Sequence, residues 1–417
     1  MQRNNFLVGI ILVIWFVISF VTNILGPLMP IIIQTYHLSL TLAAFLPFSF
    51  FLAYGIMSIP AGVMIERIGE KKSMLIAFTL NLAGAFAFAL YPQYGIALAS
   101  LFIIGIGMAM LQVIINPLMR TAGGEENFAF FSVLGQLVFG LASFVSPFIF
   151  SYLMREIPGN SSGNPFISLL HDVVQHNLYW TALYWLFTVI FILMLVVLSL
   201  IKMPVVKLNE DEKTGSLQNY LQLIKNKDVI LFFFGIVAYV GTEQAAANWM
   251  SEFLRTYHHF DPNKEGAAAV AWFWGLMSLG CLLGLGLLKL WDSKLILKVA
   301  SVITMLVVTC ALFGNAAWSL YAFPAIGFFI SVMFSIVFSL ALNSVSMHHG
   351  SFSGILCSGI FGGALIPLIV GALGDLIGLR YALLVLYVTL GYILFIAYYA
   401  RPLINNKTLR IKELLGL

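Results

Sequence analysis

Long apolar stretches alternate with short polar breaks along the whole chain. Twelve of these stretches are long enough to cross a bilayer, because a helix needs about 20 apolar residues to span the hydrocarbon core. Their length and their lack of apolar–polar alternation predict helices and not membrane strands. The twelve predicted helices cover residues 6–34, 41–65, 72–92, 94–120, 126–154, 176–202, 228–257, 264–291, 294–314, 316–343, 349–377 and 379–401.

The longest polar interruption inside the chain, residues 203–227, divides these helices into six and six. Its second part, "SLQNYLQLIKNK", predicts a short amphipathic helix on the inner membrane surface. We therefore predict an all-α membrane protein with two pseudo-symmetric six-helix bundles. Residues 1–202 form the N-terminal bundle, 203–227 a cytoplasmic linker, and 228–417 the C-terminal bundle with its tail. The longest outer segment, residues 155–177, is rich in Gly, Ser and Asn and is interpreted as a solvated connector.

Composition and charge agree with this interpretation. The chain is 61% hydrophobic and 9% charged, which is too apolar for a soluble domain of 417 residues. Of its 21 Lys and Arg residues, the loops on one side hold only Arg155, Arg255, Lys264 and Arg380. The positive-inside rule then places both termini in the cytoplasm, in a multi-pass plasma membrane such as a bacterial inner membrane. The net charge of +4 reflects this topology and gives no reason to expect nucleic-acid binding.

Glu243 stands out because it lies in the middle of the seventh predicted helix, far from any loop. A charge at that depth costs about 2.5–3.5 kcal/mol on insertion scales. No basic residue lies at a similar depth, so protonation, a bound cation such as Na⁺, or a water-filled cavity would ease the cost. The first two are the coupling event of a symporter. A structural, permanently protonated glutamate is the alternative.

Uncharged polar residues occur at similar depth. Gln244 and Asn248 share one helix face with Trp249 beside them, and Gln112 and Asn116 repeat the spacing of four in the fourth helix. Asn23 and Gln136 lie in the first and fifth helices. Amides both donate to and accept from hydroxyl groups, and aromatic rings stack on sugars, so the set suits a neutral, hydroxyl-rich solute. Hydrogen bonding between helices is the alternative for each amide.

The loop after the second helix, "GVMIERIGEKK" at 62–72, carries spaced glycines and charges. It resembles the loop signature of the major facilitator superfamily, with Glu66 in place of the usual aspartate. We predict a gating role for Gly62, Glu66, Arg67, Gly69 and Lys71, in which Glu66 caps a helix N-terminus across the inner gate. A second copy, expected near "GLGLLKLWDSK" (284–294), is degenerate.

Several further segments resemble the fucose–galactose–glucose:proton symporter family, in its glucose/galactose-type branch. They are "LQVIINPLMR" (111–120), "YVGTE" (239–243), "MFSIVFSLAL" (333–342) and "SGILCSGIFGGALIPLIVGALGDLIG" (353–378). The resemblance implies twelve helices, alternating access between the two halves, and import of a neutral sugar coupled to H⁺ or Na⁺.

The chain also departs from the fucose-type pattern. Gly26 stands where that pattern has an aspartate, and Gln112 stands where it has a glutamate. The fucose-type proton pathway therefore does not carry over, and Glu243 is the one deep group left to bind the coupling ion. We expect Gln112, Asn116, Gln244, Asn248, Asn23, Gln136 and Trp249 to bind substrate.

The predicted function is a secondary active transporter that imports a hexose-like sugar. An uncoupled facilitator, or an exporter of another small or amphiphilic solute, is the alternative. An enzyme is not expected, because neither a nucleophile–base pair nor a cluster of metal ligands occurs at membrane depth. We expect no cofactor or metal beyond the coupling ion, the lipid bilayer and a small solute as partners, and a monomer.

Overall fold

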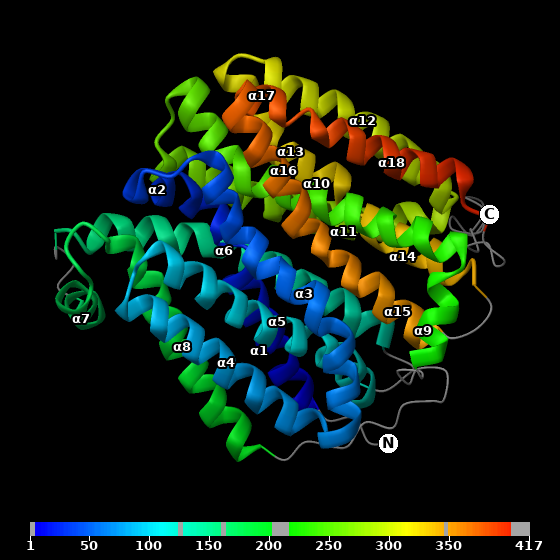
Figure 1. The fold of residues 1–417 in the computed structure, drawn as a ribbon, viewed down its shortest axis with the longest axis horizontal. Coiled ribbons are helices and arrows are strands. Elements are labelled where there is room, and N and C mark those ends of the chain that lie inside the picture. The colour runs from blue at the N-terminus through cyan, green and yellow to red at the C-terminus, as the bar shows by residue number, and fades with distance from the viewer. Residues whose placement is uncertain (1–4, 124–127, 160–163, 202–216, 346–348, 402–417) are drawn as a thin grey trace, which may run out of the picture.

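The computed structural model describes residues 5–123, 128–159, 164–201, 217–345 and 349–401 (Figure 1). These residues form helices and no strands. The first half of the chain contains α1 (Asn5–Thr22), α2 (Leu25–Tyr36), α3 (Leu40–Ile68), α4 (Glu70–Leu90), α5 (Tyr94–Gly123), α6 (Phe128–Glu156), α7 (Pro165–Val173), η2 (Tyr179–Thr181) and α8 (Ala182–Leu200).

The second half begins with the short helix α9, which falls within the predicted linker. Its elements are α9 (Leu217–Ile224), α10 (Lys227–His258), η4 (Pro262–Gly266), α11 (Ala267–Leu290), α12 (Ser293–Phe313), α13 (Ala316–Ile330), α14 (Met333–Leu342), α15 (His349–Ser358), η5 (Gly359–Phe361), α16 (Gly362–Ile377), α17 (Leu379–Ala382) and α18 (Val385–Tyr399). The described residues contain twelve segments long and apolar enough to span a membrane. The predicted all-α, twelve-helix architecture is confirmed.

Some membrane segments consist of two shorter elements, a detail that the apolar pattern did not show. The first segment breaks at Asn23 and Ile24, between α1 and α2. Pro27 accounts for the break, because proline has no N–H to donate and clashes with the carbonyl four residues back, here that of Asn23. The eleventh segment is also divided, by the 3₁₀ turn η5 between α15 and α16.

The second part of the predicted connector, residues 155–177, contains a helix, α7, which the composition did not indicate. The side chain of Asn164 accepts a hydrogen bond from the Phe166 amide (2.9 Å), and Pro165 occupies the first helical turn. Ile167 and Leu170 are buried on one face. An N-cap followed by proline is a helix-start signal that the loop-like composition obscured.

The two halves form separate bundles that pack side by side, one coloured blue to green and the other green to red (Figure 1). Buried apolar side chains form two corresponding cores, which draw almost entirely on residues 7–198 and 220–400. Contacts between the bundles join α3 to α16, α6 to α11 and α2 to α10. The boundaries assigned to the two bundles and the linker stay a prediction.

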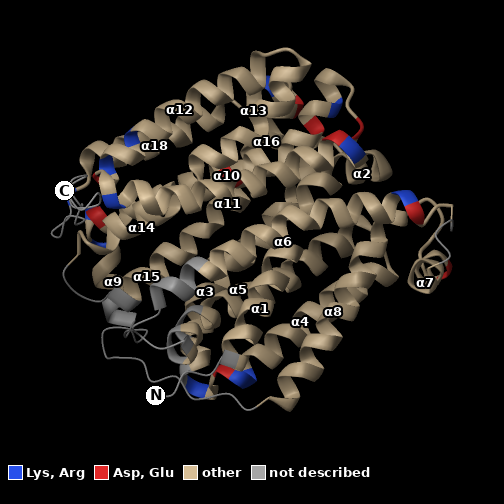
Figure 2. Cartoon of the chain, turned by 180° about the vertical axis from the view of Figure 1, so that it is seen from behind, with Lys and Arg blue, Asp and Glu red and all other residues tan. Residues whose placement is uncertain are grey.

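The pair of bundles has two ends. We call proximal the end where α1 begins and α18 ends, and distal the opposite end, where α2 leads to α3 and α16 leads to α17 (Figure 1). Charged residues gather at both ends, and the ribbon between them is almost free of charge (Figure 2). A broad uncharged band around twelve apolar helices is typical of a multi-pass membrane protein.

Candidate functional site

Glu243 lies near the middle of α10 with a half-buried side chain. Its Oε2 accepts a hydrogen bond from the Tyr239 hydroxyl (2.8 Å), and its Oε1 accepts one from Nε2 of Gln244 (3.1 Å). Among the described residues, no Lys, Arg or His forms an ion pair with it. Two neutral donors therefore stabilise the carboxylate without neutralising it, and lone pairs on both oxygens remain free for a proton or a cation.

The contact between α2 and α10 gives a reference level from which the depth of the neighbouring polar groups can be counted along each helix. Gly26 faces the Ala247 carbonyl, and a side chain at Gly26 would also approach Val270 of α11. The chain rises about 1.5 Å per helical residue, so Asn23, Gln244 and Trp274 lie roughly one turn from this contact, all on its proximal side. The fold therefore brings Asn23, Gln244 and Trp274 to about the same depth along the membrane helices as Glu243.

Asn23 sits at the break between α1 and α2. Its Nδ2 donates to Oγ of Ser143 on α6 (2.8 Å), and Ser143 and Ser19 share a hydrogen bond (2.5 Å). Its Oδ1 is buried and has no partner among the described residues. Asn23 thus both ties α1 to α6 and leaves one acceptor free.

Gln244 and Asn248 are both buried on α10, as their spacing predicts. Gln244 lies where the halves meet, because a side chain built at Gly363 of α16 would touch both Gln244 and Phe51 of α3. The Nδ2 of Asn248 is buried without a partner in the described part of the chain, as is the Nε1 of Trp274. Two unused donors and one unused acceptor match the hydrogen-bonding capacity of a hydroxyl-bearing ligand.

The other candidate substrate residues are placed differently. Trp249 is fully buried, and its Nε1 already donates to the Pro367 carbonyl (3.1 Å), so it joins α10 to α16. Gln112 is half-buried on α5 and Gln136 is exposed on α6, and neither bonds to another described side chain. The side chain of Asn116 lies outside the described residues. Hence the structure brings together Glu243 and Gln244 but does not join Gln112 or Gln136 to them.

The loop signature at 62–72 forms the tight connection between α3 and α4 at the proximal end. Gly62 is buried in α3, Arg67 is exposed, and Gly69 has a φ of 83° where the two helices meet. The Nζ of Lys71 donates to the carbonyls of Ser199 (2.9 Å) and Ile201 (2.6 Å) at the end of α8. The side chain of Glu66 lies outside the described residues, so its predicted capping role stays a prediction.

Sequence reasoning missed two residues around this site, Tyr239 and Ser143. Tyr239 precedes Glu243 by four residues, which is the helical spacing at which side chains touch, so its partnership was visible in the sequence. The meeting of Ser143 with Asn23 was not visible, because it joins residues 120 positions apart.

Twelve membrane helices in two packed bundles, with one carboxylate and unpaired amide and indole groups midway along them, define a solute transporter of the two-bundle type and not an enzyme. Comparison with known proteins names the family. The model of the Major Facilitator Superfamily matches residues 11–358. This chain belongs to the major facilitator superfamily, as the loop signature predicts.

Known relatives cover almost the whole chain. A glucose/galactose transporter of Brucella abortus is 31% identical over 411 residues, which is 94% of each chain. A putative glucose/galactose transporter of Helicobacter pylori is 27% identical, over 94% of this chain and 96% of the relative. A crystal structure of the Escherichia coli fucose:proton symporter has a TM-score of 0.68 at 21% identity, over 94% of this chain and 98% of that one, and confirms the fold.

Proposed function

We propose that this protein imports a neutral, hexose-like sugar by alternating access, and that a proton bound at Glu243 drives the import. The observation that carries the proposal is the Tyr239–Glu243–Gln244 cluster, with its carboxylate midway through the bundle and only neutral partners. The names of the relatives, glucose/galactose transporters and L-fucose-proton symporters, support the sugar and the proton.

Hydroxyl groups of a sugar would satisfy the unpaired polar atoms of the site. We assign the Asn23 Oδ1 as an acceptor and the Asn248 Nδ2 and Trp274 Nε1 as donors. An unpaired buried polar atom costs about 1–3 kcal/mol, so filling the site recovers that energy. A phosphorylated or carboxylated sugar would find no deep Lys or Arg among these residues, which makes a neutral sugar the better match.

We favour a proton over Na⁺ as the coupling ion. A proton needs one free lone pair, and each oxygen of Glu243 keeps one beyond its present hydrogen bond. A sodium ion needs several oxygen ligands, and the amide nitrogen of Gln244 cannot serve as one. Protonation would remove the charge of Glu243 before the site closes to the outside and opens to the inside. Release of the proton on the inner side would restore the charge.

We propose that the proximal end faces the cytoplasm, so that both termini are cytoplasmic, because most of the Lys and Arg residues lie on that side. The contacts of α2, α3 and α6 with α10, α16 and α11 are the surfaces that rearrange as the halves rock. All the residues that we assign to transport lie in one chain, so we propose a monomer as the functional unit. An exporter or an uncoupled facilitator is not favoured by the names of the relatives.

Uptake of labelled glucose, galactose and fucose into proteoliposomes tests the proposal. Each sugar is supplied with an imposed proton gradient, a sodium gradient or no gradient. We expect accumulation of at least one sugar above its outside concentration only with the proton gradient. Uptake that stops at equal concentrations under every gradient would reject coupling, and uptake of none of the sugars would reject the substrate class.

The Glu243→Gln variant separates coupling from binding, because glutamine mimics the neutral acid but cannot release a proton. We expect it to lose proton-driven accumulation while it still exchanges labelled for unlabelled sugar across the membrane. Glu265→Gln, which changes a carboxylate at the distal end, serves as the matched control and should accumulate sugar normally. Normal accumulation by the Glu243→Gln protein would contradict the assignment of Glu243 as the residue that binds the coupling proton.

A further inference from the structure

A second loop repeats the spacing of the signature at 62–72. Gly371, Asp375, Gly378 and Arg380 have the same separations as Gly62, Glu66, Gly69 and Lys71: glycine, an acid four residues on, glycine three further, and a basic residue two further. The predicted second copy was sought after the eighth helix, whereas this one follows the eleventh.

The backbone conformation of the two loops matches as well. Gly69 ends α3 and starts α4, and Gly378 ends α16 and starts α17. Both glycines have a φ of 83°, and no other described glycine has a positive φ. The two loops lie in different halves and at opposite ends of the bundle, the first proximal and the second distal. They are therefore related by inversion, as expected from repeats of opposite topology.

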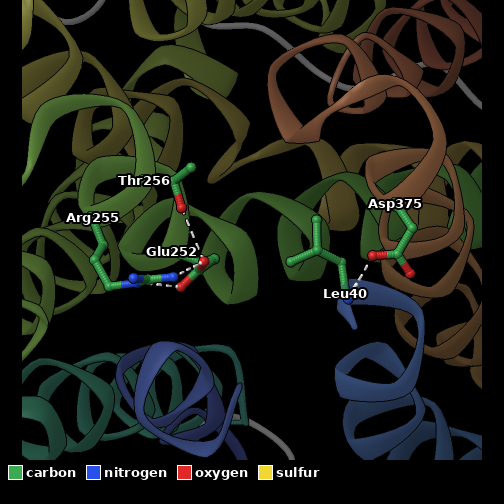
Figure 3. A network of polar contacts seen from close by, with 5 residues as sticks. All are labelled: Leu40, Glu252, Arg255, Thr256 and Asp375. Atoms are coloured by element: carbon green, nitrogen blue, oxygen red, sulfur yellow. Dashed lines mark hydrogen bonds and ion pairs between the residues drawn. The ribbon is translucent and has the colours of Figure 1, made fainter. Parts of the chain in front are cut away.

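The acid of the distal loop reaches across to the other half of the protein. The Oδ1 of Asp375 accepts a hydrogen bond from the Leu40 amide (2.8 Å) (Figure 3). Its Oδ2 accepts from the Thr41 amide (2.8 Å) and the Thr41 hydroxyl (2.5 Å). Leu40 is the first residue of α3. The carboxylate thus caps two free amides at a helix N-terminus, where the helix dipole also favours negative charge.

The surrounding residues hold the loop in position for this contact. Side chains added at Gly371 or Gly374 would come within 2.7 Å of Leu40, so the glycines let α16 approach the start of α3. On the other side of the loop, the Arg380 amide donates to the Tyr257 hydroxyl (3.1 Å), and its guanidinium lies 4.5 Å from the centre of the Tyr257 ring. The loop is fixed to its own half through Tyr257 of α10, and Asp375 adds hydrogen bonds to its packing against the other half.

We propose that Asp375 is a latch that holds the distal ends of the two halves together, and that residues 371–380 are the inverted counterpart of the loop signature at 62–71. The contact joins the two bundles, so it must break whenever the distal ends separate. It therefore stabilises the distal-closed state relative to the distal-open state. The direction of this effect rests on the proposed alternating access, but the contact itself does not depend on the identity of the solute.

Distance measurements by pulsed electron paramagnetic resonance test the latch without any transport assay. Spin labels are attached at Gln93→Cys and Trp318→Cys, which are exposed distal positions in opposite halves, after Cys281, Cys310 and Cys357 are changed to Ala. We expect Asp375→Asn to raise the ratio of distal-open to distal-closed molecules about tenfold, which is the scale of a charge at a helix N-terminus. Thr41→Val, which removes only the hydroxyl donor, should raise it about threefold, in line with one lost hydrogen bond.

Asp292→Asn is the matched control. Asp292 also caps a helix, by accepting from the Lys294 and Leu295 amides of α12, but it does so within one half. We expect it to leave the ratio unchanged. An unchanged ratio in both Asp375→Asn and Thr41→Val would overturn the latch, and so would an equal shift in Asp292→Asn. Absence of sugar uptake by the unmodified protein would overturn the proposed function while leaving these distances to decide the latch.

Discussion

At the scale of single residues, the site is built from neutral groups around one carboxylate. Glu243 accepts hydrogen bonds from the Tyr239 phenol and the Gln244 amide, and the three unpartnered atoms that we assign to the site belong to Asn23, Asn248 and Trp274. Such an arrangement separates two tasks. In the proposed function, Glu243 carries the change of charge and the amides and Trp274 recognise the sugar, so substitutions should affect the two tasks independently.

Trp274→Phe tests recognition at this scale. The change keeps an aromatic ring but removes the Nε1 donor that we assign to a sugar hydroxyl. Loss of one neutral hydrogen bond of about 0.5–1.5 kcal/mol predicts a roughly two- to tenfold higher KM for uptake. Trp272→Phe is the control, because Trp272 is 49% exposed and packs edge-on against Phe144. An unchanged KM in Trp274→Phe would remove Trp274 from the site.

At the scale of elements, the proximal and distal loops both use a tight glycine turn to fix one helix against others. In the proximal loop, Lys71 satisfies two carbonyls at the end of α8, which would otherwise lack partners. The two loops share the shape of their turn and differ in the contact that they make. The proximal loop caps α8, and the distal loop is the latch that we propose.

Lys71→Met tests the proximal contact. Methionine keeps most of the apolar stem but removes two charge-assisted hydrogen bonds, so α8 loses its cap. We expect the apparent Tm in detergent to fall by a few degrees, in line with a loss of about 1–2 kcal/mol at a partly exposed site. Lys72→Met, at the exposed neighbouring position, should leave Tm unchanged. Equal Tm values for the two variants would contradict a specific capping role.

At the scale of the whole molecule, the two halves have largely separate cores, because the cores share no buried side chain and only six of their buried residues lie in the core of the opposite half. In the proposed alternating access, the halves move as units. The equilibrium between the proximal-closed and the distal-closed states is then set by the contacts that cross between the halves at each end. Inverted loops at opposite ends would oppose each other in that balance.

Glu66→Gln tests this balance. If Glu66 caps a helix across the proximal end, its loss should favour proximal opening and therefore distal closure. We expect the distal labels to report a lower open-to-closed ratio, opposite in sign to the Asp375→Asn effect. The double variant should return towards the unmodified ratio, because the two sites are at opposite ends and should act independently. A shift of the same sign in both single variants would contradict the opposition.

The sequence by itself determined the twelve helices, the membrane class and family of the chain, and Glu243 as the unusual group. The helices, the membrane class and Glu243 follow from local composition, because apolar length sets a membrane span and a lone carboxylate within one is costly wherever it packs. The family followed instead from the resemblance of short motifs such as residues 62–72. The break at Asn23 was readable too, from Pro27, although the apolar pattern alone concealed it.

Only the tertiary structure decided which polar groups meet. Asn23 with Ser143, Trp249 with Pro367, and Asp375 with Leu40 each join residues more than 100 positions apart, and apolar helices have no strong periodicity to show which face packs inward. Trp249 therefore proved to be tied to a carbonyl, whereas Trp274 kept a free donor. In a membrane every face of a helix is apolar, so the packing of helices, and not their pattern, places each polar side chain.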